Sequence, residues 1–206
     1  MTEILQIIII ILSAIILHEY AHGWAAYRLG DPTAKEAGRL TLNPLKHIDP
    51  LGTIILPGVL LFLRSMGHSL PVFGWAKPVP VNFLRLGNPK RDMMWVGLAG
   101  PAVNIVLAII FSELLKSKTF VFDREILQFA VFFNLLLATF NMIPIPPLDG
   151  SRLVMSLLPN RYVLQYARFE GYGILVVIVL LNFGLFDHII LPVVVWLGNL
   201  LGVAFT

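Results

Sequence analysis

The sequence predicts an all-α polytopic membrane protein with about five to six transmembrane helices, a short interfacial β segment and a re-entrant or interfacial loop. Hydrophobic residues make up 57% of the 206 residues and charged residues only 13%, and the mean hydropathy is +0.82. Such a composition is typical of membrane proteins, with room for about five spans of ~20 residues and short connections. A second soluble domain does not fit, so we expect residues 1–206 to form a single domain.

The first helix is expected from Ile4 to about Leu29, because nearly every residue up to Leu17 is apolar. The Gly-Asp-Pro sequence at 30–32 ends it, since the residue before proline avoids the helical region and proline cannot continue a helix. No basic segment precedes the apolar run and no small-residue cleavage site follows it, so we expect a retained span and no cleavable signal peptide.

Three polar side chains that can serve a metal site stand in the last third of this helix. His18 and His22 are four residues apart and therefore share one helical face. Glu19 follows the first histidine and can reach a water held by the same metal ion. This H-E-x-x-H spacing is the one that zinc hydrolases use, with two ligands and one general base. Ionisable residues inside a span need partners and are functional candidates for that reason.

The connection that follows is polar and rich in turns. Within Thr33–Pro50, the Arg39–Leu42 segment is expected to be a short extended strand with a free edge, or an ordinary loop. The apolar run Leu51–Leu63 has only ~13 residues and contains Pro57, which favours a re-entrant or interfacial segment. Proline-rich Phe73–Val81 cannot form a regular helix, and its tryptophan suits the membrane interface.

Two clear spans come next, at Met93–Leu115 and Ile126–Ile143. The first carries small residues, a proline and the buried amide of Asn104, all of which suit close helix contacts. Prolines unwind the end of the second, and irregular backbone at membrane depth is tolerated only where it lines a cavity or is buried in protein. Asp149 is therefore presented from a non-helical turn.

The last apolar runs, Gly173–Phe186 and His188–Val203, are either two tilted spans or a hairpin that does not fully cross. Basic residues are concentrated between the first span and Met93 and again after Asp149, which marks those segments as cytoplasmic. His22 and Asp149 then approach the same cytoplasmic face, and by parity Leu51–Leu63 cannot cross fully. We expect a multi-pass protein of the cell (inner or plasma) membrane, with its active site near the cytoplasmic face.

A catalytic zinc ion usually has three protein ligands and one open position. The chain has no cysteine, so the third ligand must come from His, Asp or Glu. Asp149 is the best candidate because its depth matches that of His22, and Asp187 and Asp31 are the alternatives. Asn104 could hydrogen-bond the substrate carbonyl or backbone, or make an ordinary bond between helices.

These residues resemble the site-2 proteases, which are intramembrane zinc metalloproteases. The resemblance covers most of the chain and combines His18-Glu19-x-x-His22 with Gly100-Pro101-x-x-Asn104 and the Asn141 to Gly150 segment N-x-x-P-x-P-P-L-D-G. The Gly38–Pro44 and Gly74–Val81 segments look like a compact prokaryotic subgroup without a PDZ or CBS domain.

The resemblance implies one Zn²⁺ per chain, held by His18, His22 and Asp149, with Glu19 as the general base. It implies a metalloendopeptidase domain that cuts single-span substrates within the membrane, of the anti-sigma factor, membrane-bound transcription factor or signal-peptide remnant type. Nucleic acid is not expected as a partner, because the basic residues lie at membrane edges. The alternatives are another membrane zinc enzyme such as a prenyl-protein protease, disfavoured by the Leu148-Asp149-Gly150 turn, and a non-proteolytic membrane metal-binding or transport protein.

Overall fold

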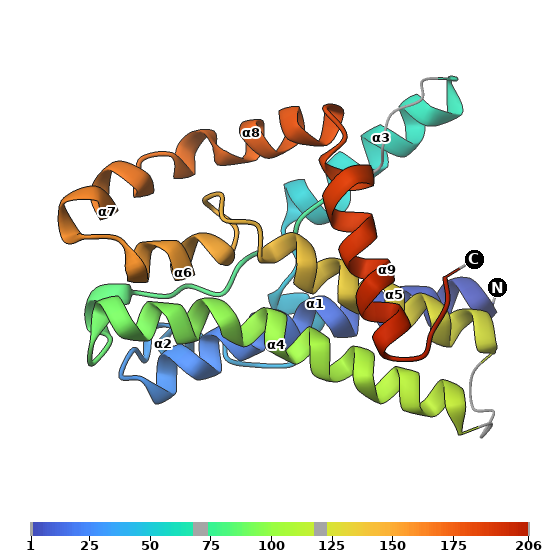
Figure 1. The fold of residues 1–206 in the computed structure, drawn as a ribbon, viewed down its shortest axis with the longest axis horizontal. Coiled ribbons are helices and arrows are strands. Elements are labelled where there is room, and N and C mark those ends of the chain that lie inside the picture. Colours follow the sequence, from blue (N-terminus) through green and yellow to red (C-terminus); the bar gives the residue numbers. More distant parts are fainter. Residues whose placement is uncertain (1, 68–73, 118–122, 206) are drawn as a thin grey trace.

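Three long helices that pack against one another form the core of the protein. The computed structural model describes residues 2–67, 74–117 and 123–205. Within these residues α1 (Thr2–Arg28), α4 (Pro89–Lys116) and α5 (Arg124–Asn141) are the longest helices, and each contacts the other two. Figure 1 shows α4 running antiparallel to both α1 and α5. The helical class expected from the sequence is confirmed, with no strand among the described residues.

Shorter helices complete the structure. Between α1 and α4 lie α2 (Thr33–Glu36) and α3 (Leu56–Ser65), with single turns η1 (Pro44–Lys46), η2 (Pro50–Ile55) and η3 (Phe83–Arg85). After α5 come α6 (Gly150–Leu157), α7 (Asn160–Ala167), α8 (Glu170–Asn182), the turn η4 (Phe186–Ile190) and α9 (Leu191–Leu200). Helix α9 closes over α5, where Leu135, Ile190 and Val194 form a buried apolar cluster.

Local sequence determines the ends of the long helices, and the end of α1 is the one expected. Helix α1 ends at Arg28, and Gly30 adopts a positive φ of 109°, a conformation that glycine takes without strain. Helix α4 begins after Asn88, whose side chain accepts a hydrogen bond from the Arg91 backbone, and has Pro89 at its first position. The predicted boundaries of α1, α4 and α5 therefore agree with the structure to within a few residues.

Small residues bring α1, α4 and α5 close together. Ala14, Ala108 and Ala130 have no accessible surface, and Gly100 of α4 faces α1 so closely that its missing side chain would overlap the α1 histidines. Helices in a bilayer associate largely through such small-residue contacts, because the hydrophobic effect does not drive helices together when they are surrounded by apolar lipid tails. The close approach is what allows side chains from three helices to meet.

The proline-rich loop between α5 and α6 is held in place from several sides. Gly97 of α4 lies against the Asp149 carbonyl, which a β-carbon there would approach to 3.0 Å. The Tyr166 hydroxyl of α7 donates to the Pro144 carbonyl at 2.6 Å. Gly173 of α8 packs directly on the Pro146 carbonyl. These contacts fix the loop although its backbone is irregular.

The number of spans is the part of the fold prediction that the structure does not confirm. Among the described residues, two helical segments, Glu3–Arg28 and Pro89–Lys116, are each long and apolar enough to cross a membrane. The number rises to three if the bent pair α7 and α8 is counted as one span. Helix α5 has 18 residues and begins with two charges, while α8 and α9 have only 13 and 10 residues. The last apolar runs are thus shorter, broken helices.

The expected β segment is also not confirmed, because Arg39–Leu42 has irregular backbone. The Thr41 carbonyl and the Arg39 side chain of this segment are both used in other hydrogen bonds. The His47 imidazole is hydrogen-bonded to the Thr41 carbonyl at 2.8 Å, and the Arg39 guanidinium donates to the Lys77 and Pro78 carbonyls. The segment is thereby tied to the irregular stretch 74–82.

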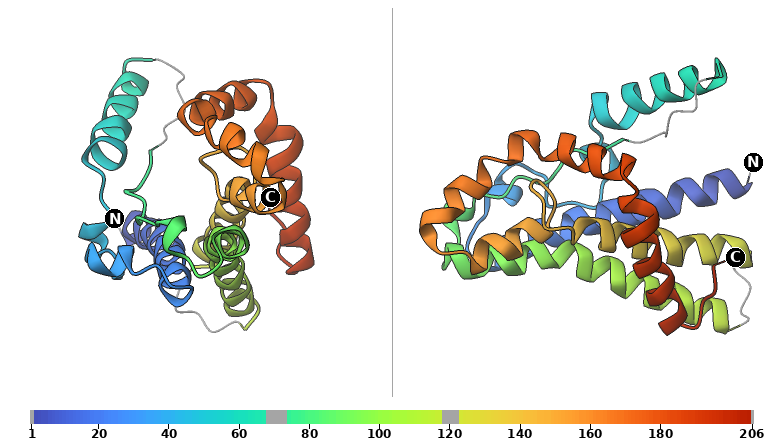
Figure 2. Two further views of the ribbon diagram at one scale, coloured as in Figure 1. Left: turned by 90° about the vertical axis from the view of Figure 1, so that its left-hand side faces the viewer. Right: turned by 45° about the horizontal axis from the view of Figure 1, so that its top comes forward.

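The apolar run Leu51–Leu63 forms η2 and α3, which together span Pro50–Ser65. Figure 2 shows α3 projecting away from the three-helix core, toward the end of the molecule where the N-terminus lies. Its side chains are largely exposed, with Val59, Leu61 and Phe62 each about half accessible or more. An exposed apolar helix of this length suits a lipid environment. That Leu51–Leu63 does not cross the membrane fully stays a prediction, based on the distribution of basic residues and on the number of spans before Met93.

Candidate metal centre

His18, His22 and Asp149 converge from two distant parts of the chain. The histidines lie one turn apart on the face of α1 that meets α4, and both are buried. Asp149 stands at the start of α6, where the proline-rich loop ends. One carboxylate oxygen, Oδ2, lies 3.1 Å from Nε2 of His18 and 3.2 Å from Nε2 of His22, and the two Nε2 atoms are 3.0 Å apart.

The hydrogen bonds behind the imidazoles determine which nitrogen carries the proton. Nδ1 of His18 lies 2.6 Å from the side-chain oxygen of Asn104, and Nδ1 of His22 lies 2.7 Å from the Val96 carbonyl. Both partners are oxygens that can only accept, so each Nδ1 must be the donor. In the neutral rings both Nε2 atoms therefore present lone pairs toward Asp149.

Three electron-pair donors thus meet with no proton between them, which is the arrangement that a cation requires. The Asp149 Oδ2 atom is inaccessible to solvent and has no hydrogen-bond partner among the described residues. Ligand atoms about 2.0–2.1 Å from a tetrahedral zinc ion are about 3.3–3.4 Å from each other, close to the separations here. Within the described parts of the chain this is the only group of three or more His, Cys, Asp or Glu side chains with such geometry.

Gly100 provides the space that the two imidazoles occupy. A methyl group on Gly100 would overlap Nε2 of His22 and lie 2.6 Å from Nε2 of His18. We expect Gly100→Ala to displace the rings and weaken metal binding about 10- to 100-fold, the range seen when groups supporting metal ligands are altered. Alanine also favours a helix interior over glycine by about 1 kcal/mol, so a loss could not be attributed to a weaker helix.

The measurement for Gly100→Ala is the zinc content of purified protein during titration with a competing chelator. Gly171→Ala in α8 is the matched control, because nothing lies within 4 Å of the added methyl. Equal zinc retention in the two variants would contradict the close contact between Gly100 and the histidines.

Glu19 stands outside the three-residue group, next to His18 on α1. Its Oε2 accepts a hydrogen bond of 2.7 Å from the Val79 backbone N–H. Val79 lies in the irregular stretch 74–82, flanked by Pro78 and Pro80, neither of which has a backbone donor. The Glu19 carboxylate is therefore held by a backbone group from a segment far away in sequence.

Asn104 has no accessible surface and its amide is fully used by protein groups. Its oxygen accepts from His18, and its nitrogen donates to the Ala14 carbonyl at 3.3 Å and to the Asn134 side chain at 3.0 Å. The structure thus places Asn104 behind a candidate ligand, the inter-helix role that the sequence also allowed. Its contact with a substrate carbonyl stays a prediction.

The two alternative third ligands lie elsewhere. Asp31 is buried and accepts hydrogen bonds from the Thr33 and Asn82 backbones, so it organises the loop after α1. Asp187 lies in η4 and is exposed. Neither joins the group formed by the two histidines and Asp149.

Three contributors to this site were not predicted from the sequence. Asn134, like Asn104, is an amide side chain inside an apolar span, and this pattern could have identified it from the sequence. The Val96 carbonyl and the Val79 N–H are backbone groups, and no residue type marks them in a sequence.

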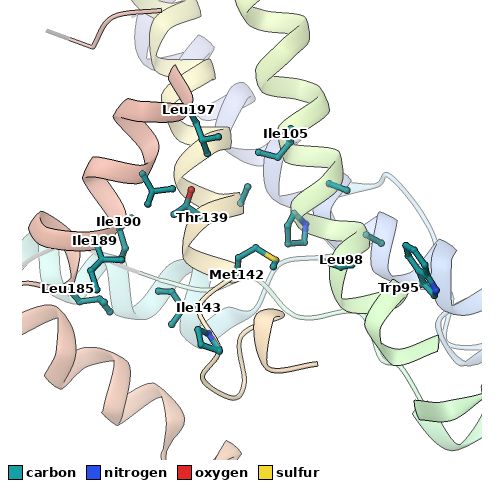
Figure 3. A pocket seen from close by; sticks show the side chains of 16 residues that line it. Trp95, Leu98, Ile105, Thr139, Met142, Ile143, Leu185, Ile189, Ile190 and Leu197 are labelled. Atoms are coloured by element: carbon teal, nitrogen blue, oxygen red, sulfur yellow. The ribbon is translucent and has the colours of Figure 1, made fainter. Parts of the chain in front are cut away.

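An apolar cavity of about 780 Å³ lies on another face of α4. Figure 3 shows its walls, with Leu98 and Ile105 on α4, Thr139 and Met142 near the end of α5, and Leu197 on α9. Its lining contains none of the three metal-site candidates.

Comparison with known proteins agrees with this chemistry. Residues 116–184 match peptidase family M50. A protein of Bacillus subtilis named "Putative zinc metalloprotease YwhC" is 36% identical over 90% of this chain and 84% of its own length. "Putative zinc metalloprotease Rip2" of Mycolicibacterium smegmatis is 30% identical over 94% of this chain and 73% of its own. No solved structure matches the chain.

Proposed function

The chain belongs to peptidase family M50, the site-2 protease family, and on that premise we propose that it hydrolyses peptide bonds within or near transmembrane segments of other membrane proteins. Membership makes it a zinc metalloendopeptidase. The observation that carries the proposal is the convergence of His18, His22 and Asp149, with both imidazole protons turned away from the centre.

The proposed depth of the site follows from helix geometry. His18 lies about 23 Å along α1 from Glu3 at 1.5 Å per residue, while the hydrocarbon core of a bilayer is about 30 Å thick. Side chains of the preceding turns such as Ile8, Ile9 and Leu12 are exposed, as a lipid-facing helix would have them. Peptide bonds delivered to this site would thus come from segments at membrane depth. The distribution of basic residues puts the site nearer the cytoplasmic face.

In the proposed mechanism His18, His22 and Asp149 would hold the zinc ion, and Glu19 moves the proton. Zinc bound there would lower the pKa of water toward ~7 and polarise the substrate carbonyl. Glu19 accepts a proton from the attacking water and delivers it to the departing amine. Its bond to the Val79 N–H keeps the carboxylate beside the site. Asn104 and Val96 keep both rings in the tautomer that can bind metal.

The substrates we propose are single-span membrane proteins of the anti-sigma factor, membrane-bound transcription factor or signal-peptide remnant type. A helical segment must unwind locally before hydrolysis, because its carbonyls are hydrogen-bonded within the helix. A transporter would be expected to carry ligand groups at several depths, whereas the described residues contain a single group of this kind.

Zinc-dependent cleavage by purified protein in liposomes tests this function. The reporter is a single-span protein, and its fragments are mapped by mass spectrometry. We expect cuts inside or beside the apolar segment, abolished by a zinc chelator and restored by added zinc. A reporter lacking the span is the control. Equal cleavage of both reporters would contradict the intramembrane assignment, and no cleavage by zinc-loaded protein would contradict proteolysis.

A further inference from the structure

A second buried amide lies directly behind Asn104. Asn134 is in the middle of α5 and has no accessible surface. Its side-chain oxygen accepts from the Asn104 amide nitrogen at 3.0 Å, and its own amide nitrogen donates to the Ala130 carbonyl at 2.9 Å, one turn back on α5. Hydrogen bonds therefore run without a break from α5 through α4 to His18 on α1.

Every bond in this series points the same way. The Ala130 carbonyl can only accept, so it fixes the Asn134 amide with its oxygen toward Asn104. That oxygen in turn requires the NH₂ group of Asn104, whose oxygen is left facing Nδ1 of His18. The proton of His18 is thereby assigned to Nδ1, and its Nε2 lone pair to the metal side.

The opposite orientation of Asn104 would disable His18 as a ligand. A flipped amide would place its oxygen against the oxygens of Asn134 and Ala14, and its NH₂ group against Nδ1 of His18. Nδ1 would then accept, and the ring proton would move to Nε2, where metal binding needs a lone pair. The Ala14 carbonyl opposes this flip only weakly, since its bond to Asn104 is 3.3 Å long. Asn134 makes the shorter of the two contacts.

We propose that Asn134 is a positioning residue for the metal centre, which acts through Asn104 to keep Nδ1 of His18 protonated and Nε2 free. The inference rests on the proposed zinc site. A carboxamide buried between helices can also serve merely to hold them together. The two roles differ in what they predict for the tautomer of His18 and for the dependence on Asn104.

Zinc affinity is the first readout. We expect Asn134→Leu, which keeps the shape but removes the acceptor, to bind zinc about 10-fold more weakly in chelator competition. Asn134→Asp should stay near wild type, because a carboxyl group buried at this apolar position is neutral. It can donate its O–H to the Ala130 carbonyl and still accept from Asn104. Ser112→Ala is the control, since Ser112 is equally buried and its hydroxyl donates to the Ile109 carbonyl of its own helix. Asn134→Ala is made in parallel and replaces the leucine variant if that protein does not fold.

The second readout separates positioning from helix packing. If Asn134 acts through Asn104, then Asn134→Leu should cause no further loss of zinc affinity in an Asn104→Ala background. Imidazole ¹⁵N NMR of metal-free protein should show the Nδ1-protonated tautomer of His18 in wild type and a mixture in Asn134→Leu. Additive losses in the double variant, or an unchanged His18 tautomer, would overturn the proposal.

These measurements also distinguish the inference from its premise. If wild type holds one zinc that depends on His18 and Asp149 while Asn134→Leu binds it equally well, only the role of Asn134 fails. If wild type holds no zinc at these residues, the proposed function itself fails.

Discussion

Replacing Glu19 by glutamine is expected to lower peptide hydrolysis about 10²- to 10⁴-fold while zinc content stays at one ion per chain. The carboxylate is not part of the three-residue group that converges on the metal position, so its charge is not needed to hold zinc. Glutamine keeps an oxygen that can accept the Val79 N–H, so the local structure is retained. What glutamine cannot do is take a proton from water.

Cleavage of the single-span reporter and metal analysis on the same preparation measure this effect. Glu36→Gln is the matched control, because Glu36 of α2 is exposed, pairs with Arg85 of η3 and is not part of the three-residue group. Undiminished cleavage by Glu19→Gln would remove Glu19 from the mechanism. A parallel loss of zinc would instead make it a ligand.

Replacing Asp149 by alanine is expected to lower the zinc affinity, which Glu19→Gln should leave unchanged. Two histidines would remain, and a catalytic zinc site normally needs three protein ligands. We expect the zinc affinity to fall more than about 100-fold, beyond the 10- to 100-fold range for residues that only support ligands, and cleavage to become undetectable. Chelator competition followed by the cleavage assay measures both.

The control for Asp149→Ala is Asp187→Asn, at the exposed carboxylate that the sequence offered as an alternative ligand. Its zinc content and activity should equal those of wild type. Loss of zinc from Asp187→Asn together with retention by Asp149→Ala would reverse the assignment of the third ligand.

The sequence predicted the core helices well because their signals are local. An apolar run closed by Gly30 and Pro32 predicted the end of α1. The second long helix was expected from Met93, and in the structure α4 begins four residues earlier, at Pro89 after the Asn88 cap. The meeting of His18, His22 and Asp149 followed from the shared helical face and from membrane depth. No wider contact map was needed for that inference.

What the sequence could not supply depends on tertiary contacts. The backbone of Arg39–Leu42 is irregular, and its Thr41 carbonyl is hydrogen-bonded to the His47 side chain. Helices α6 and α7 are too short to stand out from the polar segments around them. The Val79 contact to Glu19 comes from a backbone N–H, whose position only the fold determines.

The separation of the candidate ligands along the chain determines when, during synthesis and membrane insertion, the metal site can form. Two of them are in α1, and the third follows α5, so a ribosome must add more than 120 residues after His22 before all three exist. A nascent chain with only α1 and α4 inserted would lack Asp149 and could not hydrolyse its neighbours in the insertion machinery. Proteolytic competence would therefore arise late in biogenesis, when α5 and the proline-rich loop have docked.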